Sequence, residues 1–310
     1  MNQLRVALFA DPPVGSWAVS EFYKAQIQLS SVVSILPRTT RHDLGDEMEK
    51  QVRSSNIPFF RPASLHSNEF KSQFKETNPD VIACVSFLRK IPDEVLQIPP
   101  FGGINCHPAL LPKYRGSVPY FWVIYKQEQK SGITIHKMTN EYDSGDIYLQ
   151  QEISVEPEDT TGTLAFKCFA IGIKLLTQFF QNLRNETLPL SVPQDSLKAT
   201  YAPMPDAAIL KIDWNKPAKE ILALIRAGSP FWGAFTLFRN LPLKIWSARI
   251  SQPNTKNIKP GTLIISNGKT EAAASDFFIS LESLQLEMLR FYSGAEFSSL
   301  STLKNGEMLE

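Results

Sequence analysis

The sequence predicts an α/β fold in which a Rossmann-like domain with a mostly parallel sheet is followed by a small, OB-like β-barrel domain. In the first half of the chain, short apolar runs alternate with helical patterns, which is typical of parallel strands joined by helical crossovers. Beyond residue 234, several short strands are separated by turns, which is typical of a small barrel. We expect a first domain at 1–187, a proline-punctuated linker at 188–204 and a barrel-like domain at 205–310.

The individual elements follow from apolar periodicity. Runs rich in Val, Ile, Leu and Phe indicate buried strands, whereas apolar residues at helical spacing indicate helices. We expect strands at 4–10, 29–36, 57–60, 81–87, 104–106, 132–138, 148–155, 234–238, 243–246, 261–265 and 277–281. We expect helices at 16–25, 44–54, 68–76, 164–182 and 218–227, with capping residues at 160–163 before the longest one.

Composition excludes several classes of function. The 310 residues carry a formal net charge of +1, so no global field draws the chain towards nucleic acid or a membrane. The three cysteines are an odd number without CxxC spacing, which argues against a disulfide framework or a structural zinc site. The first apolar run is too short for a signal peptide, and no segment approaches the roughly 20 apolar residues that span a bilayer. We therefore expect a cytoplasmic protein with no membrane partner.

The most informative segment is Ile104-Asn105-Cys106-His107-Pro108. Alternate residues of a strand point to the same side, so Asn105 and His107 can face one reacting atom together. Sites of parallel sheets lie outside the carboxyl ends of the strands, and His107 stands where its strand ends. A carboxylate-rich turn, Asp143-Ser144-Gly145-Asp146, follows the strand at 132–138. Amide, imidazole and carboxylate together suit acyl transfer, as a donor to the developing oxyanion, a base, and a group that orients the base.

Simpler interpretations exist for each residue on its own. An asparagine near a strand end is often a turn residue, and Asp143 can belong to an ordinary loop. His136, in an alternating strand, is expected to be a strand residue held in place by hydrogen bonds. Cys106 lies between Asn105 and His107, so strand alternation turns its thiol into the core and away from nucleophilic chemistry. The joint pattern favours chemistry over these interpretations.

The chain resembles the family of 10-formyltetrahydrofolate-dependent formyltransferases. The matching segments are 105–108, 110–116, 134–138 and 143–147. Asn-x-His-Pro, the loop with proline and arginine, and Asp-x-Gly at this spacing are together highly specific. The resemblance covers most of residues 1–185 and extends more loosely through 212–218 and 243–248 into the second domain. This layout is similar to that of methionyl-tRNA formyltransferases and of two-domain amino-sugar formyltransferases.

The resemblance implies that 1–187 is a catalytic domain in which a primary amine attacks the formyl carbon of 10-formyltetrahydrofolate, a co-substrate. No metal is expected. Asn105 would donate its side-chain N–H to the oxygen that gains charge. His107 would accept or relay the proton of the amine, or help to hold the oxyanion. Asp143 would orient His107 and take up the proton through water.

The resemblance also implies contacts to both substrates. The loop after the strand 81–87 would line the pterin pocket, largely through backbone groups, with a second loop on the other side. The expected folate contacts are Phe87, Leu88, Arg89, Ile91, Glu141 and Tyr142. The expected contacts to the amine substrate are Asp11, Pro12, Arg115 and Gly116. For Arg115 a structural role and a substrate-facing role both stay open.

Three segments depart from the pattern of methionyl-tRNA formyltransferases. After the first strand, Asp11-Pro12-Pro13 stands where those proteins usually have Gly-Thr-Pro. Those proteins also carry a long basic insertion after the second strand, whereas the segment 37–47 is shorter and contains acidic residues within a few positions. Near the C-terminus, the segment 286–293 lacks the run of basic residues that is typical of those proteins. Phosphate contacts dominate nucleic-acid affinity, so the short loop and the near-neutral net charge weaken the prediction of a tRNA acceptor. We expect methionyl-tRNA as the acceptor, with a nucleotide-linked amino sugar of the 4-amino-4,6-dideoxysugar type as the alternative. A folate-binding regulator would not need the trio of Asn105, His107 and Asp143. In a formyltetrahydrofolate hydrolase, water would replace the amine.

Overall fold

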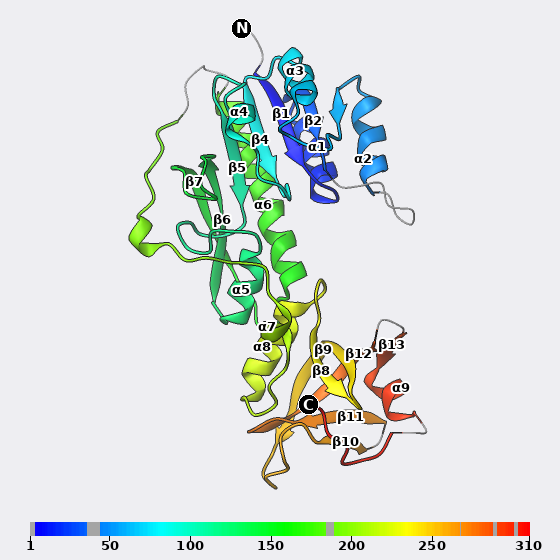
Figure 1. Ribbon diagram of the computed structural model, residues 1–310. Coiled ribbons are helices and arrows are strands. Elements are labelled where there is room, and N and C mark those ends of the chain that lie inside the picture. The colour runs from blue at the N-terminus through cyan, green and yellow to red at the C-terminus, as the bar shows by residue number, and fades with distance from the viewer. Residues whose placement is uncertain (1–3, 36–43, 184–188, 267, 288–289, 301–302) are drawn as a thin grey trace. The chain divides into compact units, whose positions relative to one another are not determined.

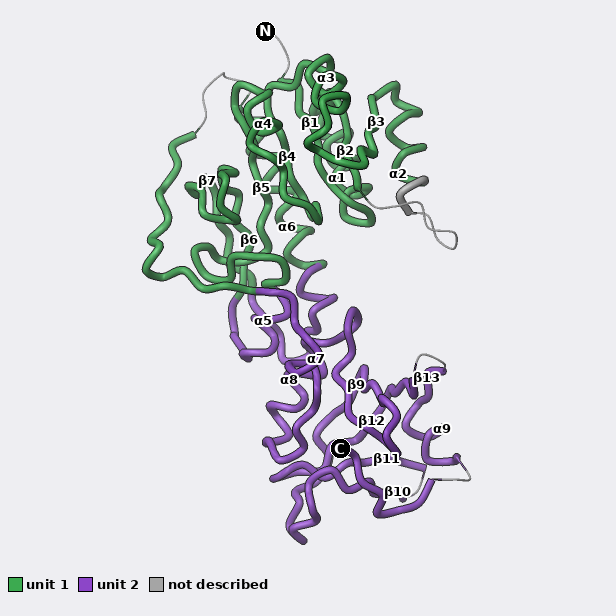
Figure 2. Tube along the Cα trace, in the orientation of Figure 1, with its two compact units in different colours: residues 1–119, 131–153, 166–202 green, residues 120–130, 154–165, 203–310 purple. Residues whose placement is uncertain are grey.

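The computed structural model describes residues 4–35, 44–183, 189–266, 268–287, 290–300 and 303–310 (Figure 1). The chain divides into two compact units, each built from segments that are separated along the sequence (Figure 2). Unit 1 comprises Met1–Pro119, Ser131–Ile153 and Phe166–Ala202. Unit 2 comprises Tyr120–Lys130, Ser154–Ala165 and Pro203–Glu310.

Unit 1 contains a seven-stranded sheet in the order β3-β2-β1-β4-β5-β6-β7. Its strands are β1 (Arg5–Ala10), β2 (Gln28–Val33), β3 (Phe59–Phe60), β4 (Val81–Val85), β5 (Gly103–His107), β6 (Lys130–Lys137) and β7 (Ile147–Ser154). The pairs from β3 to β5 are parallel, and β6 is antiparallel to β5. The predicted mostly parallel α/β sheet is therefore confirmed.

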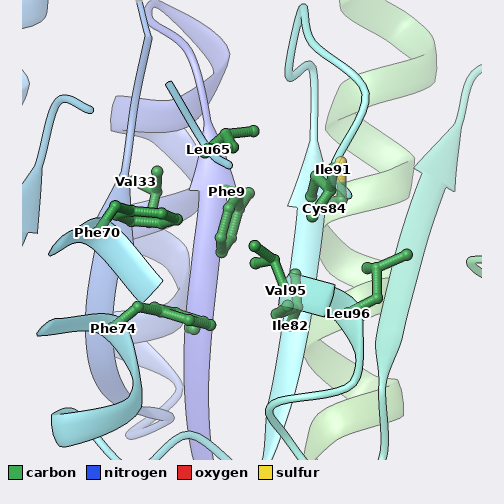
Figure 3. Close-up of a cluster of buried hydrophobic side chains, with 11 residues drawn as sticks. Phe9, Val33, Leu65, Phe70, Phe74, Ile82, Cys84, Ile91, Val95 and Leu96 are labelled. Atoms are coloured by element: carbon green, nitrogen blue, oxygen red, sulfur yellow. The ribbon is translucent and has the colours of Figure 1, made fainter. Parts of the chain in front are cut away.

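Helices cover both faces of this sheet (Figure 1). They are α1 (Val14–Lys24), α2 (Leu44–Arg53), α3 (Asn68–Glu76), α4 (Asp93–Leu96) and α6 (Thr161–Asn182). On one face, Phe70 and Phe74 of α3 pack with Phe9 of β1 and Cys84 of β4 in a buried apolar cluster (Figure 3). Because strand side chains alternate, the neighbouring residues of β1 and β4 face the layer of α1 and α6.

The helix α6 has 22 residues and is long and apolar enough, by length and composition, to cross a membrane. This corrects the expectation that no segment approaches that length. Half of its apolar window is buried inside the protein, and the ring of its Phe180 packs edge-on against Phe22 of α1 at 5.8 Å. Gly172 of the same helix approaches the sheet so closely that a Cβ there would clash with Cys106 Sγ. These contacts are those of a core helix of a globular domain.

Unit 2 contains a six-stranded antiparallel sheet in the order β10-β11-β12-β9-β8, with β13 paired to β12. Its strands are β8 (Ala234–Phe238), β9 (Leu241–Pro253), β10 (Leu263–Ser266), β11 (Lys269–Ala273), β12 (Phe277–Leu286) and β13 (Arg290–Ser293). Its helices are α5 (Pro119–Tyr125), α7 (Ala207–Leu210), α8 (Ala218–Gly228) and α9 (Gly294–Ser298).

The last residues of the chain connect the two ends of this sheet. Leu309 bridges to Phe238 of β8, and Met308 bridges to Thr262, which precedes β10. Both bridges are antiparallel. The terminal segment thus joins the first and last strands of the order, as a barrel-like domain requires.

Candidate active site

Asn105, His107 and Asp143 meet at the carboxyl edge of the parallel strands. Asn105 and His107 lie on β5 and face the same side, as strand alternation predicts. Asp143 comes from the turn after β6, where its φ of 52° lies in the left-handed region. Asn105 Nδ2 lies 3.2 Å from Asp143 Oδ1, and His107 Nδ1 lies 3.4 Å from Asp143 Oδ2. One carboxylate therefore contacts both the amide and the imidazole.

The carboxylate of Asp143 is held in its ionised form. Burial alone would raise its pKa, but the neighbouring imidazoles of His107 and His136 and the backbone N–H of Gly116 together lower the pKa well below its usual range. The Gly116 N–H donates to Asp143 Oδ2 at 2.8 Å. An ionised carboxylate at neutral pH can stabilise a proton that arrives on the neighbouring imidazole.

His107 is a buried imidazole with a fixed orientation, and the residue is only 3% exposed. Its Nε2 lies 2.9 Å from the carbonyl oxygen of Tyr114, which accepts a hydrogen bond, so Nε2 carries the hydrogen and Nδ1 faces Asp143. Burial lowers the pKa of His107 and outweighs the opposing effect of the Asp143 charge. The imidazole is neutral at pH 7, and its free nitrogen is the one that faces the carboxylate.

His136 completes the cluster, although its position in a strand gave no reason to place it there. It is the direct partner of Asn105 in the antiparallel pair β5–β6, so both side chains lie on one face. His136 Nδ1 donates to the Lys137 carbonyl at 2.9 Å, which leaves Nε2 to accept from Asn105 Nδ2 at 3.1 Å. The two hydrogens of the Asn105 amide are thus directed at His136 and Asp143. The strand pairing was the signal that could have revealed this contact.

Two loops at the same edge contain the expected folate contacts. Leu88 is 72% exposed after β4, and Tyr142 is 63% exposed after β6. Lys90 joins the two loops, because its Nζ lies 3.2 Å from Asn140 Oδ1 and 5.7 Å from the centre of the Tyr142 ring. Exposed apolar and aromatic side chains on adjoining loops form a surface that suits a flat, largely apolar ligand.

The other expected folate contacts are partly occupied by structural interactions. Ile91 is 2% exposed within the apolar cluster, so it belongs to the core and does not present its side chain to a ligand. The Phe87 ring packs against Phe9 at 5.4 Å, and Arg89 donates to the carbonyl of Ala63. The carbonyl of Glu141 accepts from Thr139 and Ser144 hydroxyls. Within the described ranges, no group of three or more His, Cys, Asp or Glu side chains is arranged to hold a metal ion.

Asp11 and Pro12 point into the protein. Asp11 is 2% exposed, and its Oδ1 accepts from Ser34 Oγ at 2.7 Å and from the Ile35 N–H at 2.9 Å. Its Oδ2 accepts from the Leu88 N–H at 3.2 Å. The carboxylate therefore joins the ends of β1 and β2 to the loop after β4. Pro12 is also buried, so neither expected substrate contact presents its side chain to solvent.

Arg115 and Gly116 lie beside the trio. Gly116 has a φ of 117°, where a side chain would be strained, and a Cβ would approach the carbonyl oxygen of Ala202 to 3.1 Å. Arg115 is 5% exposed, and its Nε and Nη2 donate to Gln194 Oε1 at 3.2 and 2.8 Å. Of the two roles left open for Arg115, this geometry favours the structural one.

Gln194 falls in the predicted linker at 188–204, and the sequence predicts no functional role for it. Its Nε2 donates to the carbonyl oxygens of Asp143 at 2.8 Å and Gly145 at 2.7 Å, while its Oε1 accepts from Arg115. No local pattern marks this glutamine, because its partners are about fifty and about eighty positions away in the chain.

Comparison with known proteins places this arrangement in a family. Residues 23–179 match the formyl transferase family, and residues 207–300 match the formyl transferase C-terminal domain. A methionyl-tRNA formyltransferase from Caldicellulosiruptor saccharolyticus is 37% identical over 257 residues, which cover 82% of each chain. A methionyl-tRNA formyltransferase from Clostridioides difficile is 32% identical over 257 residues, again with 82% of each chain covered.

Solved structures share the fold at lower identity. HypX from Aquifex aeolicus, solved in complex with tetrahydrofolic acid, has a TM-score of 0.65 at 15% identity. The match covers 100% of this chain, which spans about half the length of HypX, 51%. WlaRD, a sugar 3N-formyl transferase, has a TM-score of 0.64 at 17% identity, with 91% of this chain and 98% of that chain covered. From the two matched regions and the identity to its relatives, the chain belongs to the formyl transferase family.

Proposed function

We propose that this formyltransferase transfers the formyl group of 10-formyltetrahydrofolate to the amino group of methionyl-tRNA. The observation that carries the proposal is the contact of Asn105 and His107 with one ionised carboxylate, Asp143, in a chain that is 32–37% identical to methionyl-tRNA formyltransferases. The relatives match over both the first and the second part of the chain. The described structure has three buried free cysteines, which suits the reducing environment of the cytoplasm.

The loops after β4 and β6 fit the folate. Leu88 in the first loop and Tyr142 in the second offer exposed apolar surface, and the hydrogen bonds of Asp11 and Lys90 hold the two loops in place. The folate brings a formyl group that is already activated towards amines, so the protein mainly positions and stabilises. We assign the pterin side of the ligand to these two loops, and the formyl carbon to the face of Asn105 and His107.

His107 and Asp143 act together on the proton of the amine. His107 is neutral with a free Nδ1, and its hydrogen-bonded Nε2 fixes the ring plane. When the amine adds to the formyl carbon and becomes cationic, its proton moves to His107 Nδ1 or to water held at that position. Asp143 Oδ2, 3.4 Å away, stabilises the resulting imidazolium. As the intermediate collapses, the bond from the formyl carbon to the folate nitrogen breaks, and that nitrogen takes up the proton so that tetrahydrofolate leaves. Asp143 itself stays ionised because its pKa is lowered.

Asn105 supplies the donor for the formyl oxygen. Both hydrogens of its amide have partners, His136 Nε2 at 3.1 Å and Asp143 Oδ1 at 3.2 Å. Both contacts are longer than a strong hydrogen bond. As the formyl oxygen gains negative charge, one of these contacts is exchanged for a shorter, charge-assisted bond to that oxygen. The remaining contact keeps the amide plane oriented.

The acceptor is tested by parallel assays with different amines. Purified protein is supplied with 10-formyltetrahydrofolate and, in parallel, with methionyl-tRNA, uncharged tRNA, or a panel of nucleotide-linked 4-amino sugars, and the release of tetrahydrofolate is followed. The proposal predicts release with methionyl-tRNA alone. Release with a sugar alone would overturn the acceptor and keep the chemistry.

Two further arms separate the remaining alternatives. Release without any acceptor would identify a hydrolase, in which water replaces the amine. Binding of folate without release in any arm would identify a folate-binding regulator. The segment 37–47, whose acidic character weakens the prediction of a tRNA acceptor, lies largely outside the described residues. Residues 288 and 289 of the segment 286–293 also lie outside them.

A further inference from the structure

Residues 189–202, which we name the strap, run along unit 1 with little regular structure of their own. A single 3-10 turn, Ser196–Lys198, interrupts an extended path through the strap. Val192 pairs with Ile147 at the start of β7, and Tyr201 pairs with Arg115. Extended chain of this kind is held by its partners rather than by internal hydrogen bonds, so its contacts define what it does.

The strap touches both loops that reach the trio. At the Arg115 loop, Thr200 O accepts from the Arg115 N–H at 2.8 Å, and the Ala202 N–H donates to Arg115 O at 2.8 Å. At the other loop, the Gln194 amide donates to the carbonyls of Asp143 and Gly145. Gln194 Oε1 accepts hydrogen bonds from the Arg115 guanidinium.

The residues on either side of Arg115 complete a closed network. The Tyr114 carbonyl accepts from His107 Nε2, and the Gly116 N–H donates to Asp143 Oδ2. A displacement of Arg115 therefore moves partners of both His107 and Asp143. Gln194 is the one described side chain that joins Arg115 to the backbone of the Asp143 turn.

We propose that Gln194 is a positioning residue, which with Arg115 fixes the backbone of the Asp143 turn so that its carboxylate reaches His107. Asp143 has a left-handed φ, so the turn depends on outside contacts to keep its conformation. The side-chain amide of Gln194 donates to two carbonyl oxygens of the turn. A side chain of equal size without the amide would remove the hydrogen bonds to both carbonyls and to the Arg115 guanidinium. The kinetic part of this inference rests on the proposed function, whereas its structural part does not.

The kinetic test compares three variants. Gln194→Leu removes every hydrogen bond of the side chain. Gln194→Glu keeps an acceptor for Arg115 and removes both donors to the Asp143 turn. Leu197→Ala is the matched control, because Leu197 lies in the same strap and is 98% exposed.

We expect both Gln194 variants to lose about 10- to 100-fold in kcat, with KM for either substrate changed less than about twofold, since a misplacement of about 1 Å costs roughly this much. Leu197→Ala should match the wild type. A Gln194→Glu variant with wild-type kcat would overturn the proposal, because it lacks the donors to Asp143 and Gly145. A rise in KM at constant kcat would also overturn it.

A crystal structure of Gln194→Glu provides the test that needs no activity. We expect the Asp143 carboxylate to have moved out of contact with His107 Nδ1 and with the Gly116 N–H, which lie at 3.4 and 2.8 Å in the native chain. An unchanged turn would overturn the proposal, even if the wild type proved inactive with every acceptor. A displaced turn in an inactive family member would uphold the positioning role and reject only the proposed function.

Discussion

Asn105 and His136 stand directly opposite each other in the antiparallel pair β5–β6, and Asn105 Nδ2 lies 3.1 Å from His136 Nε2. The imidazole can accept this hydrogen bond because its other nitrogen donates to the Lys137 carbonyl. The orientation of the Asn105 amide, and with it the aim of its donor, is therefore set by a neighbouring strand. His136 therefore takes part in the site through its contact with Asn105.

The first prediction concerns His136. His136→Leu should lower kcat by about 3- to 10-fold, because the Asn105 amide loses an acceptor and one hydrogen bond is worth about 0.5–1.5 kcal/mol. His136→Gln, whose carbonyl can accept from Asn105, should retain more of the activity. Steady-state kinetics and thermal unfolding of the two variants provide the measurement. Equal activity of the Leu and Gln variants would contradict an orienting role.

The second prediction concerns the acid side of the pH profile. His107 accepts a proton only while it is neutral, and burial lowers its pKa below the ordinary value of about 6.5. Activity is therefore fully present at pH 7 and is lost as the pH falls through this lowered pKa. The dependence of kcat/KM on pH measures it. His66→Gln, a change of an exposed histidine, should leave the profile unmoved, whereas an acid limb above about pH 7 would contradict a neutral His107.

The third prediction concerns Asp143. Asp143→Asn should lower kcat by at least about 100-fold, because an amide cannot stabilise the imidazolium as a carboxylate does. Because the pKa of Asp143 is lower in the folded than in the unfolded state, its ionisation stabilises the fold at pH values above the unfolded-state pKa of about 3.9. This stabilisation is lost as the pH falls from there towards the lowered pKa of the folded state. Urea unfolding should show a wild-type advantage over Asp143→Asn that narrows below about pH 4. A constant difference at all pH values would contradict the assignment.

The fourth prediction concerns the closure of unit 2. Leu309 is 3% exposed, and its neighbour Glu310 exchanges both backbone hydrogen bonds with Leu237. Leu309→Ala should lower the free energy of unfolding by about 2–4 kcal/mol, as for other buried leucines. Lys304→Ala, at an exposed position nearby, is the control. Denaturant unfolding gives the difference, and a loss below about 0.5 kcal/mol would show that the terminal segment does not stabilise the sheet.

Much of unit 1 could be predicted because its local signals are strong. The buried strand β4 and the helix α3 have clear apolar periodicity, and α3 was placed at its observed bounds, Asn68–Glu76. Strand alternation alone placed Asn105 and His107 on one face and turned Cys106 away. The helix α5 was missed, because it is short and begins at a proline that also suits a loop.

Other features depend on contacts that a local pattern does not carry. β9 extends over Leu241–Pro253, whereas only 243–246 was expected, because its second half is mostly exposed and lacks apolar alternation. The strap falls within the predicted linker, because its order comes from partners such as Arg115 and Asp143 that are distant in sequence. The role of His136 depended in the same way on strand register.

The most direct measurement is the single-turnover rate of formyl transfer to methionyl-tRNA, with both substrates saturating, for the wild type, Asn105→Ala and His107→Ala. If these side chains stabilise the oxyanion and take the proton, each variant should lose at least about 100-fold in this rate while its melting temperature and folate affinity stay close to those of the wild type. Rates within a few-fold of the wild type in either variant would contradict the assignment of chemistry to this cluster.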